Sequence, residues 1–309
     1  MIIRLGTEND IPEIAQLLKQ SLGEQLLPKS EALWIWKHVL NPFGKSPVLL
    51  AVTEDKLIGV RAFMNWEYRW EGKIIRANRA VDTAVHPDFQ GKGIFSQLTR
   101  KLLDKSRIEG VDLLFNTPNQ SSTPGYLKMG WEKWDRLPIK VKPTFYFGSE
   151  EKLSPPSDWE KAELIVRQIE RNEPESSRLH THLVPGYLTW RYRECPVVNY
   201  KILTDYHSYF LVYRTKDTRW GKELRICDLF TLGNIDQKLL NDHLRRVERV
   251  EKSRFTTLSG LAFSQNDHLL KGFLPALKIG PWITLKQINP EINPLDLPWA
   301  WSLGDLEVF

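Results

Sequence analysis

Apolar positions in the first half of the chain follow two spacings, one typical of strands and one typical of helices. Ile11, Ile14 and Leu18 recur at three- and four-residue intervals, which places them on one helix face, and Asp10 with Glu13 forms a capping pattern before it. Other runs are β-branched and bounded by turn residues, as strands are. We predict strands at 2–5, 48–53, 57–66, 73–85 and 111–116, and helices at 11–22, 32–40, 94–107 and 124–129.

The order of these elements predicts a fold class. Three consecutive strands between residues 48 and 85 are separated only by the short turns 54–55 and 71–72, so they are expected to be antiparallel neighbours. A helix, a buried strand, a short helix and a further strand follow. We therefore predict an α/β (α+β) domain, with a mixed and mostly antiparallel sheet flanked by helices on both faces.

A polar, proline-rich stretch divides the chain and is expected to be a linker. Beyond it, Ser157 and Glu160 form a capping-box pattern that predicts a helix reaching about residue 171. A second folded region is expected to continue from there. The predicted organisation is a first domain at 1–147, the linker at 148–157 and a second domain at 158–309.

The second region carries a faint repeat of the first. Residues 36–38 (Trp-Lys-His) resemble residues 190–192 (Trp-Arg-Tyr), and Asp82 resembles Asp228 at a similar distance downstream. One interpretation is a tandem of two related domains, and the other is a chance likeness among tryptophan-rich strands. The second copy has no glycine-rich loop, because residues 229–234 run directly into a predicted helix.

Composition and charge exclude several classes of function. The formal charge of +5 comes from 43 basic and 38 acidic side chains that are interspersed, so no nucleic-acid partner is expected. The two cysteines form no CxxC motif, and His180 and His182 have no acidic or cysteine neighbour in the sequence, so no metal site is expected. The chain start lacks a signal-peptide pattern, and no apolar run has the length of a membrane span. A cytoplasmic protein without a membrane partner is the expectation.

The most informative stretch is residues 80–96, where a β-branched strand meets Pro87, two glycines and an amphipathic helix. Gly91 and Gly93 permit backbone conformations that point N–H groups inward. The new helix adds its own free N–H groups and the positive end of its dipole. Together these groups would hold a pyrophosphate, with Lys92 at the rim. The spacing matches neither a Walker A loop nor a full Rossmann fingerprint.

This stretch resembles motif A of the GNAT acyltransferases, in which Q/R-x-x-G-x-G/A follows a strand. Gln90 and Gly93 match the motif, while Phe95 replaces its final small residue. A second likeness lies at 116–131, where a strand is followed by Asn, by Tyr on a short helix and by Gly-Trp. The resemblance covers residues 1 to about 135 and implies the GNAT fold. It also implies that the second region is a degenerate tandem copy that has lost the loop.

The resemblance implies an N-acyltransferase that uses acetyl-CoA, or another acyl-CoA, as co-substrate and needs no metal. An acceptor amine would attack the thioester directly, without a covalent enzyme intermediate. The coenzyme A moiety would contact the backbone at the end of the motif A strand, the loop, the first helical turn and the Asn that follows the next strand. The implied cofactor-binding residues are Val85, Gln90, Gly91, Lys92, Gly93, Ile94, Phe95, Ser96 and Asn119.

Two residues are implied as catalytic. Tyr126 matches the family's usual acid, and a phenol, with an ordinary pKa of about 10, is suited to protonating a departing thiolate. Its alternative role is packing of the short helix. Asp82 on the motif A strand is a candidate base, and its alternative role is that of a hydrogen-bonded structural carboxylate. His86 precedes the loop and is expected to be a solvated side chain rather than a base.

Two other functions stay open at this point. Tandem GNAT folds also occur in peptidyl transferases that use aminoacyl-tRNA, but those generally lack the glycine-rich loop that this chain has. A non-catalytic binding protein with a relic site is the other, and only Phe95 favours it. The expected acceptor is a small-molecule amine of unknown identity, with O-acylation as an alternative. The second region would cover part of the acceptor site or form a homodimer.

Overall fold

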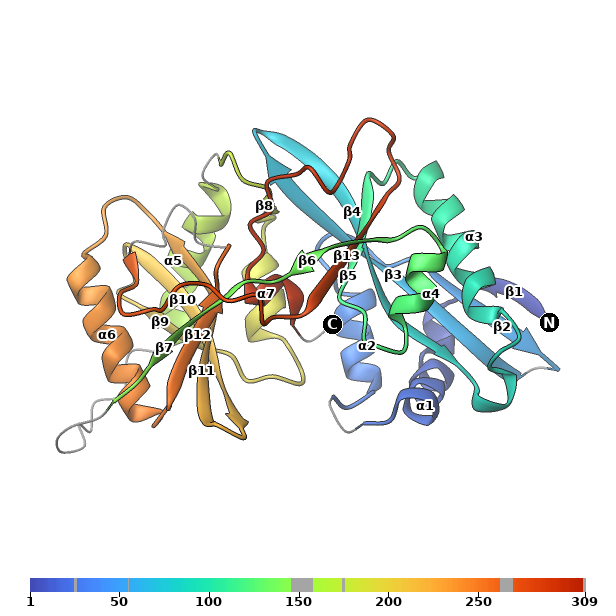
Figure 1. The fold of residues 1–309 in the computed structure, drawn as a ribbon, viewed down its shortest axis with the longest axis horizontal. Coiled ribbons are helices and arrows are strands. Elements are labelled where there is room, and N and C mark those ends of the chain that lie inside the picture. The colour runs from blue at the N-terminus through green and yellow to red at the C-terminus, as the bar shows by residue number, and fades with distance from the viewer. Residues whose placement is uncertain (25–26, 55, 146–157, 174–175, 262–268, 308–309) are drawn as a thin grey trace.

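The structure, a computed structural model, describes residues 1–24, 27–54, 56–145, 158–173, 176–261 and 269–307. Two β-sheets, each flanked by helices, lie side by side along the long axis of the molecule (Figure 1). The predicted fold class, a mixed and mostly antiparallel sheet with helices on its faces, is confirmed. No helix among these residues is long and apolar enough to cross a membrane. The linker predicted at 148–157 lies outside the described residues.

The first sheet has the strand order β1-β2-β3-β4-β5-β13-β6, and the short β8 also pairs with β3. Alternate residues of β2 belong to different cores: Leu50 packs with α1 and α2, whereas Leu49 and Ala51 pack with α3 and α4. The two helix pairs therefore cover opposite faces. The bounds are β1 (Ile2–Leu5), α1 (Ile11–Leu22), α2 (Glu31–His38), β2 (Val48–Thr53), β3 (Lys56–Trp70), β4 (Lys73–Val85), α3 (Ile94–Ile108), β5 (Leu113–Asn116), α4 (Thr123–Lys128), β6 (Glu132–Arg136), β8 (His180–Thr181) and β13 (Trp282–Gln287).

The second sheet repeats this arrangement with the order β7-β12-β11-β10-β9. Strands β9, β10 and β11 are antiparallel neighbours. The chain then forms α6 and returns as β12, which pairs with β11 in parallel. In the first sheet, β5 pairs with β4 in parallel after α3 in the same way. The internal repeat predicted from the sequence is therefore present in the topology. The bounds are β7 (Ile139–Pro143), α5 (Trp159–Arg171), the π-helical turn η3 (Thr189–Arg193), β9 (Lys201–Thr204), β10 (Tyr209–Thr218), β11 (Gly221–Thr231), α6 (Gln237–Val250), β12 (Phe255–Ser259) and α7 (Leu303–Leu306).

The two sheets exchange strands. β13, from late in the chain, lies in the first sheet between β5 and β6, where it is antiparallel to both. β7, from the first half of the chain, pairs with β12 in the second sheet. The predicted boundary at 148–157 therefore does not separate the sheets. β5 precedes this boundary but pairs with β13, which follows it, and β12 follows the boundary but pairs with β7, which precedes it.

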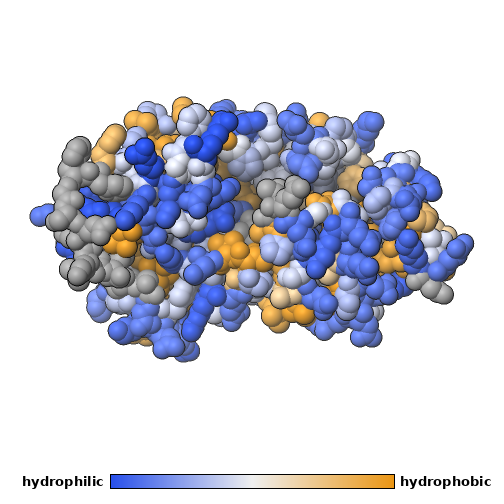
Figure 2. Space-filling view, turned by 90° about the horizontal axis from the view of Figure 1, so that it is seen from below, coloured by the Kyte–Doolittle hydropathy of each residue, from blue (hydrophilic) through white to orange (hydrophobic). Residues whose placement is uncertain are grey.

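Two stacked tryptophans, Trp36 on α2 and Trp190 on η3, join the units. Their ring centroids are 5.0 Å apart, and each indole N–H donates to the main-chain carbonyl of the other residue, at 2.7 and 2.8 Å. The contact is reciprocal, so equivalent positions of the repeat face one another across the junction. Hydrophobic residues also gather near the middle of the long axis on the face seen from below (Figure 2).

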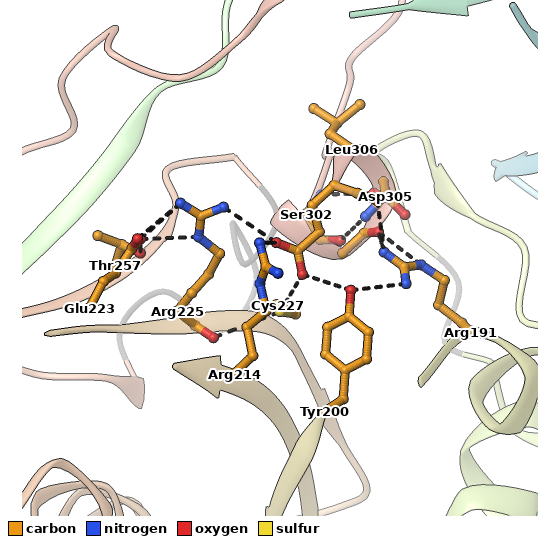
Figure 3. A network of polar contacts seen from close by, with 12 residues as sticks. Arg191, Tyr200, Arg214, Glu223, Arg225, Cys227, Thr257, Ser302, Asp305 and Leu306 are labelled. Carbon is orange, nitrogen blue, oxygen red and sulfur yellow. Dashed lines mark hydrogen bonds and ion pairs between the residues drawn. The ribbon is translucent and has the colours of Figure 1, made fainter. Parts of the chain in front are cut away.

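The C-terminal segment, residues 302–307, is buried between the units. Arg79 of β4 donates to the main-chain carbonyl of Leu306 at 2.8 Å, and Arg191 of η3 donates to that of Gly304 at 3.0 Å. Arginines from the first sheet and from the second unit therefore hold the same short segment. Figure 3 shows how the side chains of the second unit converge on it.

The Glu307 carboxylate is the acidic centre of this network. It accepts a hydrogen bond from Tyr200 at 2.9 Å and pairs with Arg214 and Arg225 at 2.9 and 3.3 Å. Burial would raise the pKa of Glu307, but the neighbouring guanidinium groups outweigh it and hold the pKa below its usual range. Glu307 therefore stays charged, and its charge is balanced.

Two further buried carboxyl groups, those of Asp228 and Asp305, lie beside the same segment. Tyr192 donates a hydrogen bond to Asp228, and Thr181 donates to Asp305 at 2.6 Å. Burial, together with the proximity of the other carboxyl group, raises the pKa of Asp228 to about 8. Burial also raises the pKa of Asp305.

Asp228→Asn is expected to reduce the pH dependence of stability. The raised pKa keeps Asp228 protonated in the folded chain at pH values where the unfolded chain, with an ordinary pKa of about 4, has lost that proton. The folded state then binds one proton more. The free energy of unfolding of the wild type therefore falls as the pH rises from about 4 towards 8, by at most about 1.4 kcal/mol per pH unit from this group. Urea titrations of both proteins across this range measure the difference, and parallel pH profiles would contradict it.

Two predicted helix caps need correction. Asp10 occupies the N-cap position of α1, as predicted, but its carboxylate accepts from the Thr7 N–H at 2.7 Å and pairs with Arg4 instead of accepting from an N–H group of α1. The cap of α5 is Asp158, whose carboxylate accepts from the N–H groups of Glu160 and Lys161, the second and third residues of the helix. Ser157, which the sequence pattern favoured, lies outside the described residues.

Candidate functional site

The two parallel strands β4 and β5 separate part-way along their length. Their pairing runs from Ala77 with Leu113 to Arg79 with Phe115, and β5 ends one residue later. β4 continues to Val85, paired with β3 on its other side. In the described part of the chain, residues 80–85 therefore have no strand partner on the side of β5. We call this stretch the open edge of β4.

The glycine-rich loop follows directly at the end of the open edge. Gly91 and Gly93 have φ values of +76° and +75°, a left-handed conformation that favours glycine. A Cβ atom added at Gly91 would meet no atom within 4 Å, so the space beside the loop is open. Gly93 is the N-cap of α3, and among the described residues no side chain caps its first turn. These N–H groups and the helix dipole fit a phosphate group.

The equivalent helix of the second unit lacks this arrangement. α6 begins after Asp236, whose carboxylate accepts from the Leu239 N–H at 2.9 Å. The side chain thus satisfies the helix N-terminus and places a negative charge where a phosphate would bind. The geometry agrees with the sequence-based interpretation that the second copy has lost the loop.

Other residues predicted to bind the cofactor lie around the loop. The Val85 carbonyl accepts from the side chains of Gln90 and Ser21, at 3.2 and 3.1 Å. Lys92 is exposed, and its Nζ lies 4.7 Å from the centroid of the Phe89 ring. The loop is thus tied to the end of β4 by Gln90, and Lys92 is free to reach a bound anion.

The first turn of α3 joins the loop to the rest of the domain. Ile94 is buried over Gly59 of β3, where an added Cβ would lie 2.9 Å from the Ile94 side chain. Phe95 packs against α4, where a Cβ on Gly125 would lie 3.1 Å from its ring. A glycine on α4 thus accommodates the large residue that departs from motif A. Ser96 is half-buried in the same turn.

Asn119 lies between β5 and α4. Its side-chain oxygen accepts from the Ser122 N–H at 2.9 Å, and its main-chain carbonyl accepts from Thr123. Asn119 therefore orders the turn that enters α4. Asn119 is exposed.

Tyr126 lies inside the domain, between α3 and the open edge. Its ring makes edge-to-face contacts with Phe95 and Trp131, with centroids 5.7 and 5.2 Å apart. Its oxygen accepts a hydrogen bond from Arg61 of β3 at 2.9 Å. Because a guanidinium can only donate, the phenol keeps its own hydrogen for another acceptor. Tyr126 is therefore both a packing residue and a group able to donate a proton.

Asp82 is a residue of β4 at a bulge, with φ of +43°. Its buried carboxylate pairs with Lys37 and lies 3.0 Å from Nε2 of His38. Burial would raise the pKa of Asp82, but Lys37 and His38 outweigh it and hold the pKa well below its usual range. A carboxylate held in this way is a weak proton acceptor, which favours the structural interpretation of Asp82.

Asp82→Asn is expected to lower the free energy of unfolding by about 3–5 kcal/mol, because Lys37 would stay buried without its counter-charge. Chemical denaturation measures the loss. Asp104→Asn is the matched control, since Asp104 forms an exposed pair with Arg107 on α3 and its loss should change little. A folded Asp82→Asn protein whose kcat falls by more than about 100-fold would instead support the role of general base.

The histidines noted in the sequence have structural partners. His86 accepts from the Asp88 N–H at 3.3 Å and thereby caps a short turn, with its side chain largely buried. His180 lies 3.2 Å from Glu173, and His182 lies 3.0 Å from Glu67. Glu67 is 115 residues from His182, so the sequence did not reveal this pair, whereas Glu173 lies only seven residues before His180. Among the described residues, no cluster of three or more potential ligands is arranged to hold a metal ion.

Three residues of the site were missed in the sequence. Lys37 and His38 belong to the Trp-Lys-His sequence at 36–38, which resembles Trp-Arg-Tyr at 190–192. This repeat was the only feature of the sequence that could have indicated a buried partner for Asp82. Arg61 is the single charged residue in the apolar run Leu57–Trp66, which marks it as unusual for a central strand.

In this fold, the open edge of β4 leads into a glycine-rich loop that is suited to binding an anion. Residues 2–134 match the family model of the acetyltransferase (GNAT) domain. The match covers the first unit, which is less than half of the 309 residues, and shows that this unit is similar to GNAT acetyltransferase domains. Enzymes of this family use an acyl-CoA as co-substrate and act on small-molecule or protein acceptors. Among curated proteins, no sequence matches the chain.

Several solved structures share the fold over both units. A GCN5-related N-acetyltransferase from Anabaena variabilis ATCC 29413 is 15% identical, with a TM-score of 0.62. A probable N-acyltransferase from Enterococcus faecalis V583 is 12% identical, with a TM-score of 0.67. Eis1 from Mycobacterium abscessus is 15% identical, with a TM-score of 0.60. Each likeness covers 93% of this chain and 73% of the other, and at these identities it establishes the fold.

Proposed function

We propose that this protein is an N-acyltransferase that transfers an acetyl or related acyl group from acyl-CoA to the amine of a small-molecule acceptor. The observation that carries the proposal is the open edge of β4 leading into the uncapped N-terminus of α3. The open edge offers main-chain groups to the pantetheine arm, and the loop offers N–H groups to the pyrophosphate. The residues proposed to hold the cofactor are Val85, Gln90, Gly91, Lys92, Gly93, Ile94, Phe95, Ser96 and Asn119.

In the proposed reaction, the acceptor amine attacks the carbonyl carbon of the thioester within a ternary complex. A C–N bond forms, the C–S bond breaks, and the sulfur leaves with the bonding electrons. Tyr126 donates its phenolic proton to this sulfur, since Arg61 leaves that hydrogen unused. The amine loses its proton to water rather than to Asp82, whose carboxylate is occupied by Lys37 and His38.

Calorimetric titration with acetyl-CoA tests the proposal. The wild type is expected to bind, and the double variant Gly91→Ala, Gly93→Ala to bind at least about tenfold more weakly, a loss of about 1.4 kcal/mol. The reason is that both glycines adopt a left-handed conformation that a side chain disfavours. Gly233→Ala is the matched control, because Gly233 also has a positive φ but lies in the equivalent loop of the second unit.

Two outcomes would count against the proposal. If the wild type binds neither acetyl-CoA nor longer acyl-CoAs, the acyltransferase assignment of this site fails, and a tRNA-dependent transferase or a relic site becomes the better interpretation. If the wild type binds but the double variant binds equally well, the cofactor lies elsewhere than on the loop.

A further inference from the structure

Arg61 is a fully buried arginine whose guanidinium lies beside the open edge of β4. Gly59, Arg61 and Phe63 alternate along β3 and face α3. Nη1 of Arg61 donates to the hydroxyl of Thr83, within the open edge, and to that of Tyr126 on α4. The guanidinium therefore connects the strand and the helix between which the proposed acyl-CoA would lie.

Half of this guanidinium has no partner. Nε and Nη2 of Arg61 are buried and make no hydrogen bond to any described residue. These two groups lie on the same edge of the planar guanidinium, which is the edge that binds a carboxylate through two parallel hydrogen bonds. A buried donor without an acceptor costs about 1–3 kcal/mol. The arrangement is thus that of a binding edge without its anion.

The charge of Arg61 is also unbalanced. In the described part of the chain no carboxylate forms an ion pair with it, whereas the half-buried Arg225 pairs with both Glu223 and Glu307. The rings of Phe63, Phe95 and Tyr126 lie 5.1 to 5.3 Å from the Arg61 guanidinium carbon. Aromatic faces attract a cation, but they accept none of its in-plane N–H groups as a carboxylate does. The surroundings of Arg61 therefore favour an anionic ligand.

Position along β4 indicates which part of the donor this anion belongs to. The proposed phosphate groups lie at the loop, beyond Val85, where Lys92 and the α3 N-terminus serve them. Thr83, which contacts Arg61, lies two residues before Val85 and next to the bulge at Asp82. Arg61 is thus further along the open edge from the loop, towards the end of the pantetheine arm that carries the acyl group.

We propose that the acyl group of the donor itself carries a carboxylate, which accepts hydrogen bonds from Nε and Nη2 of Arg61. The donor class is then the coenzyme A half-thioester of a dicarboxylic acid. This inference rests on the proposed function. In the transfer, the amine nitrogen forms its bond to the thioester carbon, coenzyme A leaves as the thiol after taking up a proton, and the distal carboxylate is unchanged. The product is an amide with a negative charge where the acceptor had an amine.

Calorimetry with three probes tests this inference: coenzyme A, butyryl-CoA and succinyl-CoA, the last two having four-carbon acyl groups that differ in the terminal carboxylate. The wild type is expected to bind succinyl-CoA at least about tenfold more tightly than butyryl-CoA, since a hydrogen bond to a charged group contributes about 1.5–3 kcal/mol. Arg61→Met should abolish the preference and leave affinity for coenzyme A within about twofold. Arg107→Met, at an exposed site on α3, should retain the preference.

Each other outcome overturns a defined part of the argument. Equal affinities of the wild type for succinyl-CoA and butyryl-CoA overturn the inference, even if Arg61→Met fails to fold. An equal loss for all three probes in a folded Arg61→Met protein also overturns it, and assigns Arg61 to the phosphates or to packing. If the wild type binds none of the three, the proposed function fails as well, whereas binding of coenzyme A without any preference leaves the proposed function standing.

Discussion

Tyr126→Phe is expected to lower kcat by about 10²–10⁴-fold, the usual contribution of a positioned acid, while the affinity for acyl-CoA stays nearly unchanged. The phenol is the candidate proton donor to the departing thiolate, and its hydrogen is not used by Arg61. Phenylalanine retains the ring contacts with Phe95 and Trp131, so the variant isolates the hydroxyl. Steady-state kinetics with an accepted amine, combined with calorimetric titration of the donor, separates the two quantities.

A second tyrosine provides the control for loss of a buried hydroxyl. Tyr209 lies in the core of the second unit, and its hydroxyl bonds to His243. Tyr209→Phe removes the same group far from the open edge and should leave kcat unchanged. If Tyr126→Phe retains full kcat, Tyr126 is only a packing residue, and the thiolate takes its proton from water.

Trp36→Ala is expected to lower the free energy of unfolding by about 3–5 kcal/mol. The substitution leaves a cavity against Trp190. It deletes the Trp36 indole N–H that donates to the Trp190 carbonyl, and it displaces the Trp190 indole that donates to the main-chain carbonyl of residue 36. The strand exchange distributes this loss over both sheets. Hydrogen exchange should therefore show reduced protection in β3 and in β10 alike, rather than in the first unit alone.

An exposed tryptophan serves as the comparison. Trp220 is 70% exposed in the turn between β10 and β11, so Trp220→Ala should change stability by less than about 0.5 kcal/mol. The double variant Trp36→Ala, Trp190→Ala should lose less than the sum of the single losses, because the two residues contact one another. Additive losses, or loss of protection confined to the first sheet, would show that the units are energetically independent.

The cofactor loop was predictable because its chemistry is local. Two glycines one residue apart, directly before an amphipathic helix, determine the left-handed φ values of Gly91 and Gly93 and the free helix N-terminus. The spacing of apolar residues in the neighbouring strands is also a short-range pattern, and β4 was predicted with its observed bounds at 73–85. Short-range patterns therefore sufficed to identify the anion-binding loop and the first unit.

The partners of the buried charges were not predictable in the same way. Asp82 is paired with Lys37 and His38, and Arg61 with Tyr126, across separations of 44 to 65 residues. A single sequence does not specify such pairings. The same limit applies to β7 and β13: both have ordinary strand patterns, and nothing within either strand indicates that its partner lies in the other unit.

The position of β13 affects how the chain reaches its final form during synthesis. Residues 282–287 fill the gap between β5 and β6, yet the ribosome makes them long after β6 has emerged. At about 5–20 residues per second, the interval is on the order of ten seconds. During this time β5 and β6 present edges that other chains can pair with. A nascent chain would therefore need a chaperone, or rapid packing of α3 and α4, to avoid aggregation before its own last strand arrives.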